Sequence, residues 1–181
     1  MNLQKLFKTQ KILDDRILEE KGLEGQDLLP EKILALQVEL GELANEWRVF
    51  KFWSENREPR TKARRKSRDF LGKPIAINRN PLLEEYVDCL HFILSIGNEL
   101  GFQNQVRRSK IINLEKDILE QFSMTFGEVV MLEESRFLKL YEILMNIFLG
   151  LGDLLGFTLK QIETAYYSKN KINHARQENG Y

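Results

Sequence analysis

The chain has 181 residues, of which 43% are hydrophobic and 30% charged, enough apolar surface for one core and too little length for two domains. Lysine plus arginine and aspartate plus glutamate number 27 each, so net charge does not argue for nucleic acid as a partner. The lone Cys89 excludes an intramolecular disulfide, and neither a signal region nor an apolar run of about 18 residues is present. We therefore expect one domain over residues 1–181, cytoplasmic and without membrane contact.

Apolar residues recur at spacings of three and four along most of the chain, and strand-like alternation is absent. This pattern predicts an all-α bundle with a core of about four to five helices. The expected helices cover about residues 2–21, 30–53, 82–100, 104–122, 125–134 and 136–155. A last helix begins at Thr158, which with Gln161 forms a potential capping box. Because the helix over 82–100 is apolar nearly all round, we expect it at the centre of the bundle.

Residues 54–80 interrupt this pattern. They contain two prolines and a dense basic stretch from Arg57 to Arg68. The composition predicts a long loop, inserted into the domain and disordered or only partly ordered.

Two segments of the chain resemble each other. Residues 90–102, LHFILSIGNELGF, align with residues 145–157, MNIFLGLGDLLGF, and both end in a glycine suited to a left-handed helix cap. The match is short enough to arise by chance, since buried helices share composition. The alternative is a duplicated pair of helices.

Two pairs of carboxylates are the most informative chemical feature. Glu39 and Glu42, and likewise Glu85 and Asp88, are three residues apart, so each pair projects from one face of its helix. Glu85 and Asp88 interrupt the apolar central helix, where carboxylates are costly unless paired or bound to a cation. Alternatively, Glu39 and Glu42 form a solvated helix face, and Glu85 and Asp88 complement a helix dipole.

Oxygen ligands without clustered histidine or cysteine suit Mg²⁺ or Mn²⁺, and Mg²⁺ commonly binds together with substrate phosphates. Lys169, Asn173 and Arg176 share one face of the last helix and could donate to phosphate oxygens. Cations that merely complement the dipole of a terminal helix would look the same. With the carboxylates, these residues indicate hydrolysis at a phosphoanhydride.

Three blocks, ELGELANEWRVFKFW, EEYVDCLHFILSIG and the tail KNxxNxxRQ, resemble in order and spacing the dimeric all-α dUTP diphosphatases, which belong with the MazG-like nucleotide pyrophosphohydrolases. The first helix, LFKTQKILDDRI, is also similar to that family's opening. The resemblance covers most of the chain. It implies that a homodimer hydrolyses dUTP, and also dUDP, to dUMP with two or more Mg²⁺ ions, for which Mn²⁺ would substitute.

The resemblance also implies roles for individual residues. The carboxylates match the family's metal ligands, which are catalytic: Glu39, Glu42, Glu85 and Asp88. The residues expected around the phosphates are Lys169, Asn173, Arg176, Lys51 and Tyr181. Those expected near the base and sugar are Gln10, Trp53 and His91. Glu46 would assist the acidic cluster. Each of the base and sugar residues has a plain structural alternative, such as a hydrogen-bonded core histidine for His91.

No motif here distinguishes uracil from cytosine, so a dCTP-acting or broadly specific pyrophosphohydrolase stays open, as does a non-catalytic helical protein that binds a nucleotide or a partner. The basic connection 54–80 is longer than the family pattern leads us to expect. It would cover the phosphates, contact an anionic partner or be disordered, and disorder is the leading interpretation.

Overall fold

The computed structural model describes residues 1–68, 73–106, 111 and 117–180. This part of the chain contains six helices and one two-stranded sheet, which confirms the all-α prediction. The elements are α1 (Leu3–Lys21), α2 (Leu29–Trp47), β1 (Ala63–Arg68), β2 (Pro74–Arg79), α3 (Pro81–Glu99), α4 (Ile118–Ser135), α5 (Leu138–Leu154) and α6 (Leu159–Glu178).

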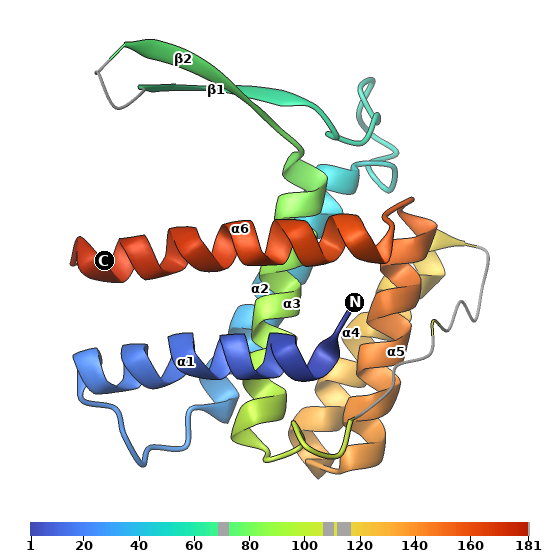
Figure 1. Cartoon of the computed structure of the whole chain (residues 1–181). Helices are drawn as coiled ribbons and strands as arrows, with labels where there is room; N and C mark the ends of the chain where they lie inside the picture. Colours follow the sequence, from blue (N-terminus) through green and yellow to red (C-terminus); the bar gives the residue numbers. More distant parts are fainter. Residues whose placement is uncertain (69–72, 107–110, 112–116, 181) are drawn as a thin grey trace.

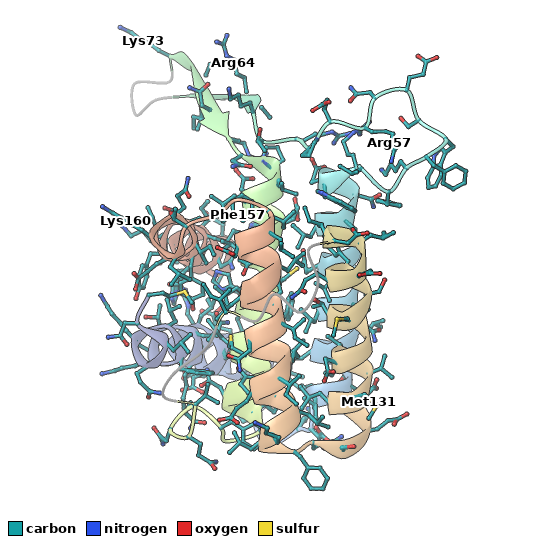
Figure 2. The ribbon with its side chains drawn as sticks, turned by 90° about the vertical axis from the view of Figure 1, so that its right-hand side faces the viewer. Arg57, Arg64, Lys73, Met131, Phe157 and Lys160 are labelled. Carbon is teal, nitrogen blue, oxygen red and sulfur yellow. The ribbon has the colours of Figure 1, made fainter. Side chains whose placement is uncertain are left out.

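The helices form two groups (Figure 1). Helices α2, α3, α4 and α5 stand side by side as a bundle, and α1 and α6 lie next to each other across α3. A view turned by 90° shows the four upright helices together, with α1 and α6 nearly end on (Figure 2). Helix α3 packs against α1, α2, α5 and α6, so the predicted central helix is confirmed.

The apolar periodicity accounts for these contacts. On α2, the residues that recur in steps of three and four, Leu36, Leu40 and Leu43, are fully buried. On α3, eleven of nineteen residues are buried, as expected for a helix that is apolar nearly all round. The predicted capping box at Thr158 and Gln161 is present at the start of α6.

The two similar segments occupy equivalent places in α3 and α5. The Tyr86 hydroxyl donates to the Phe148 carbonyl at 3.0 Å, and the Tyr141 hydroxyl donates to the Ile93 carbonyl at 2.9 Å. Each tyrosine also fills the space where a side chain would be at a glycine of the other helix. A Cβ at Gly152 would lie 2.4 Å from the Tyr86 hydroxyl, and one at Gly97 would lie 2.3 Å from that of Tyr141. The two helices are therefore packed by reciprocal contacts.

Several predicted boundaries were wrong. Helix α2 ends at Trp47 instead of Trp53, because Arg48 adopts a left-handed conformation with φ of 64° and the chain turns away. Residues 118–135 form one helix, without the break predicted between 122 and 125. The predicted helix over 104–122 is absent from 104–106, and residues 107–110 and 112–116 lie outside the described part of the chain. The apolar spacing over 136–155 also predicts a core position for Phe137, but this side chain is 67% exposed.

The prediction of a long loop over residues 54–80, with disorder as the leading interpretation, was wrong for the residues that form β1 and β2. These strands form an antiparallel hairpin in which Ala63 lies opposite Arg79. The hairpin extends away from the helices, and Arg64 and Lys73 lie on it (Figures 1 and 2). The sequence shows no alternation here because β1 is almost entirely polar and charged, so the hydrophobic signal that identifies a strand is missing.

Among the described residues, none of the helices taken singly is long and apolar enough to span a membrane. Helices α5 and α6 together would be long and apolar enough, but their axes are bent by 107° at the break between them.

Candidate active site

A cavity of about 520 Å³ lies where α1, α2, α3, α6 and the end of β2 meet. Its lining divides into three parts. Carboxylates come from α2 and α3, cations and amides from α6, and a mixed polar and apolar floor from α1 and α3. The helices that carry the three blocks of sequence therefore converge on one cavity.

Three of the four predicted metal ligands form a compact cluster. One carboxylate oxygen from each of Glu39, Glu85 and Asp88 lies within 4.8 Å of the other two. Glu42 lines the same cavity one turn along α2 from Glu39 and is exposed. Such a group of carboxylates could hold a divalent cation, since hard cations prefer oxygen ligands.

The cluster concentrates negative charge in a partly buried place. Burial and then repulsion from Asp88 raise the pKa of Glu85 from 4.5 to about 7. The same two causes, in the same order, raise the pKa of Glu39 to about 7, and Lys169 opposes this shift. Burial also raises the pKa of Asp88. A bound cation would relieve both the repulsion and the cost of burial.

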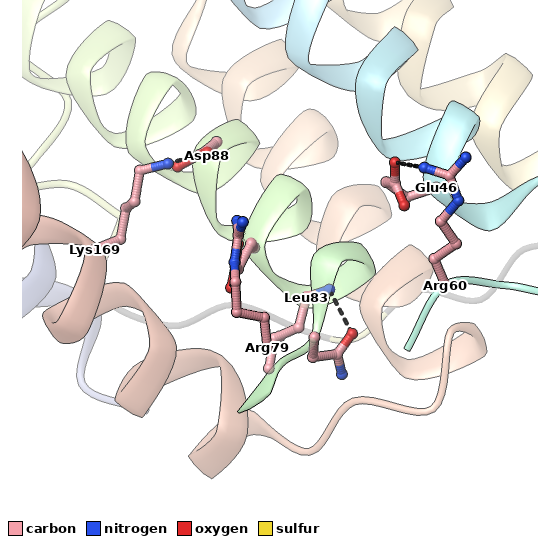
Figure 3. Close-up of polar contacts among 8 residues, drawn as sticks. Glu46, Arg60, Arg79, Leu83, Asp88 and Lys169 are labelled. Carbon is pink, nitrogen blue, oxygen red and sulfur yellow. Dashed lines mark hydrogen bonds and ion pairs between the residues drawn. The ribbon is translucent and has the colours of Figure 1, made fainter. Parts of the chain in front are cut away.

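The predicted phosphate-binding face of α6 borders this cluster. Lys169 donates to Asp88 in a part-buried ion pair, which crosses from α6 to α3 (Figure 3). Asn173 and Arg176 follow on the same face and also line the cavity. The structure thus places donors suited to phosphate oxygens opposite the carboxylates.

The floor of the cavity holds a hydrogen-bond network centred on Gln10. Its amide nitrogen donates to Asp14 at 2.8 Å, so its oxygen points the other way. That oxygen accepts a hydrogen bond from His91 Nδ1 at 2.7 Å and another from the Tyr166 hydroxyl at 3.0 Å. The His91 ring also stacks on Tyr166, with ring centroids 4.3 Å apart. Both Gln10 and His91, predicted near the base and sugar, are therefore held in place by α1 and α6.

The ionisation of the floor follows from its burial. Burial, and then the charge of Lys169, lower the pKa of His91 to about 3 against a smaller opposing effect of the Tyr166 backbone, so the ring is neutral at pH 7. Since an amide oxygen can only accept, the proton of this neutral ring is on Nδ1. His91 Nε2 is buried and makes no hydrogen bond with the described residues. It therefore presents an acceptor. Burial raises the pKa of Asp14 to about 6.

The structure does not bring every predicted residue to the cavity. Trp53 is 65% exposed and packs edge-on against Phe50 and Phe52. The Lys51 ammonium lies over the Phe50 ring, 5.6 Å from its centre, outside the cavity lining. Glu46 is paired with Arg60 at 2.9 Å (Figure 3). Tyr181 lies outside the described residues.

Asp14, Ser95 and Arg79 are among the lining residues that the sequence analysis missed. Asp14 and Ser95 each follow a predicted residue by four positions on the same helix, so helical spacing could have found them. Arg79 gave no such signal, because it reaches the cavity from the hairpin.

Comparison with known proteins agrees with this arrangement. A family model described as dUTPase matches residues 2–69 and 73–181. No curated protein sequence matches the chain. The family match extends over nearly the whole chain, including all the residues that line the cavity and are named above. The protein therefore belongs to the dUTPase family, and it is an enzyme that hydrolyses dUTP.

Proposed function

We propose that the enzyme hydrolyses dUTP to dUMP and pyrophosphate in a reaction that depends on Mg²⁺, and that it also converts dUDP to dUMP and phosphate. The observation that carries this proposal is the cluster of Glu39, Glu85 and Asp88 opposite Lys169 in one cavity. A cavity with carboxylates on one wall and cations on another suits a metal-bound polyanion. We propose a cytoplasmic location, which suits a chain whose lone Cys89 is a buried free thiol.

The donor set fits Mg²⁺, because the cluster consists of carboxylate oxygens alone. Glu39, Glu85 and Asp88 would hold the cation, and Glu42 would join them when a second ion binds. Bound Mg²⁺ would neutralise phosphate charge and acidify a water molecule, and Mn²⁺ would substitute.

The chain's own residues supply the remaining steps. Lys169, Asn173 and Arg176 donate to phosphate oxygens and hold the phosphate chain against the carboxylates. A carboxylate of the cluster accepts a proton from the attacking water. Because Lys169 is paired with Asp88 before the ligands bind, its ammonium is already within the cavity.

Selection of uracil follows from the ring of His91. In uracil, N3 carries a hydrogen and is a donor, whereas in cytosine N3 is an acceptor. The unprotonated Nε2 of His91 would accept from uracil N3 and face a lone pair of cytosine. A buried polar group left unpaired by the wrong base gives strong discrimination.

We also propose that the enzyme is a homodimer. Helices α2 and α4 pack against each other, and both carry exposed apolar side chains: Leu34, Val38, Val130 and Met131. Figure 2 shows Met131 on the outer side of α4. A second copy of the chain would remove these side chains from water.

The experiment is to measure the release of pyrophosphate from dUTP, dCTP, dTTP and UTP during a titration with Mg²⁺. The proposal expects turnover that requires Mg²⁺ and that strongly favours dUTP. Equal rates with all four nucleotides would overturn the selection of uracil in favour of a broadly specific enzyme. Absence of any turnover would leave a non-catalytic nucleotide-binding protein.

A further inference from the structure

We propose that Arg79 is an additional phosphate-binding residue, whose guanidinium leaves Glu84 and binds the outer phosphates of the nucleotide. The inference rests on the proposed function in one respect, namely that a triphosphate occupies the cavity. It assigns a ligand contact to the basic hairpin, which the metal and base sites leave without a role.

Arg79 is held at the edge of the cavity by its position in the chain. It is the last residue of β2, and the next residue, Asn80, caps α3 by accepting a hydrogen bond from the Leu83 amide at 3.1 Å. Its side chain lines the cavity together with Glu85, Asp88 and Lys169. Figure 3 shows that Arg79, from β2, and Lys169, from α6, both lie next to α3, which carries Asp88.

The segment that leads into β1 is anchored as well. The Arg60 amide donates to the Glu46 carbonyl at 2.9 Å, and the Arg60 guanidinium pairs with the Glu46 carboxylate at the same distance. In return, the Arg60 carbonyl accepts from the Leu82 amide at 3.1 Å. The base of the hairpin is thus tied to both α2 and α3, and this keeps Arg79 next to the carboxylate cluster.

The present partner of Arg79 has the geometry of a phosphate substitute. Arg79 Nε donates to Glu84 Oε1 at 2.8 Å, while its Nη2 donates to the other oxygen, Oε2. A guanidinium makes the same forked contact with two phosphate oxygens. The two side chains are 37% and 31% exposed, so the pair is accessible to water and to a ligand in the cavity. Exchange of the carboxylate for a phosphate would replace one forked contact of the guanidinium with another.

A second cation of the site, Lys169, is likewise paired with a carboxylate. Lys169 is paired with Asp88 of the carboxylate cluster, and a cation bound there would release its ammonium toward the phosphates. Glu84 is outside the cluster, so a metal does not displace Arg79 from it. An anion such as a phosphate can do so. Arg79 would then respond to the triphosphate itself and Lys169 to the metal.

The hairpin offers a matched control. Arg64 lies on β1 opposite Asn78, is exposed, and is not among the residues that line the cavity. Arg64→Gln removes the same charge from the same hairpin as Arg79→Gln. Glu84→Gln tests the alternative that the pair only braces the start of α3, because it breaks the pair and leaves the guanidinium in place.

The experiment is calorimetric titration of wild type and the variants with α,β-imido-dUTP and with inorganic triphosphate, in Mg²⁺. We expect Arg79→Gln to weaken the binding of both ligands by about tenfold or more, because a charge-assisted contact is lost. Arg79→Lys, which keeps the charge without the fork, should fall between Arg79→Gln and wild type. Arg64→Gln should bind as wild type does, and Glu84→Gln should bind more tightly, because the competing carboxylate is gone.

Two results would overturn the inference. One is unchanged binding of inorganic triphosphate to Arg79→Gln or to Arg79→Lys, whichever folds. The other is an equal loss in Arg79→Gln and Glu84→Gln, which would make the pair structural. Failure of wild type to hydrolyse dUTP would instead overturn the proposed function, and the titration with inorganic triphosphate would still decide the role of Arg79.

Discussion

Lys169 on α6 forms an ion pair with Asp88 on α3, so a cation from the proposed phosphate-binding face neutralises one carboxylate of the cluster formed by Glu39, Glu85 and Asp88. The pair compensates part of the negative charge that Glu39, Glu85 and Asp88 bring together. Binding of a divalent cation to Asp88 would replace the ammonium. Lys169 would then be available to phosphate oxygens, which couples the binding of metal to the binding of nucleotide.

The first prediction concerns the cluster itself. Asp88→Asn should lower the rate of dUTP hydrolysis at least about 100-fold, because the amide is a poor ligand for a hard cation. The helices should remain, since this side chain has Lys169 as its only hydrogen-bond partner among the described residues. Steady-state kinetics and far-UV circular dichroism measure the two effects. Glu133→Gln, on the exposed surface of α4, is the matched control and should retain full activity.

The second prediction concerns the pH dependence of stability without metal. Folding raises the pKa of Glu85 from 4.5 to about 7, so between these values the folded protein holds a proton that the unfolded chain releases. The contribution of this group to stability is therefore lost as pH rises through that window. The side chain introduced by Glu85→Gln cannot ionise, so the variant does not lose stability in this way as the pH rises. In EDTA, the Tm of the variant minus that of wild type should increase from pH 4.5 to 7 and then level off.

The comparison with wild type matters because Glu39, Asp14 and His91 also titrate in this range. These three groups are present in both proteins, so their contributions largely cancel in the difference. A Tm difference that is constant or that decreases with pH would show that Glu85 is not held in an unfavourable ionised state.

The third prediction tests whether His91 selects the base. Gln10→Leu removes the acceptor of His91 Nδ1 and leaves this buried donor unpaired, at a cost of roughly 1–3 kcal/mol. The Tyr166 hydroxyl keeps its second acceptor, the Leu6 carbonyl at 3.4 Å. The ring would then be free to carry its proton on Nε2. The ratio of kcat/KM for dUTP to that for dCTP should fall about tenfold or more.

A second glutamine on α1 separates selectivity from stability. Gln4 donates to the carbonyls of Gln103 and Val106 and is remote from the cavity lining. Gln4→Leu should lower the free energy of unfolding and leave the nucleotide ratio unchanged. If both variants alter the ratio equally, the orientation of His91 is not what selects uracil.

The fourth prediction concerns the dimer. Glutamates in place of Leu34 and Val38, which are 62% and 52% exposed on α2, would place two charges in the proposed interface. Sedimentation velocity should show a dimer for wild type and a monomer for this double variant. Ile12→Glu makes a similar change at an exposed site on α1 and should leave the dimer intact. A wild-type monomer at all concentrations would contradict the homodimer.

Helical periodicity explains what the sequence could predict. The spacing of Glu85 and Asp88 within an apolar helix predicted a cluster of carboxylates, and the structure brings both side chains next to Glu39. The same rule, applied four residues beyond Gln10 and His91, would have identified Asp14 and Ser95.

Other features depend on events that periodicity does not report. The left-handed backbone conformation of Arg48 ends α2 six residues earlier than predicted. Lys51 and Trp53 therefore do not continue the helix, and they lie outside the cavity. Arg79 reaches the cavity because a polar strand pairs with β2, and pairing between backbones leaves no pattern when the side chains are mostly charged.

The most direct test of the account is calorimetric titration of wild type and Asp88→Asn with α,β-imido-dUTP, in Mg²⁺ and in EDTA. If the carboxylate cluster holds the cation that binds the triphosphate, wild type should bind the analogue far more tightly in Mg²⁺, and Asp88→Asn should lose most of this gain. Equal affinity of wild type in Mg²⁺ and EDTA, or an undiminished gain in Asp88→Asn, would contradict it.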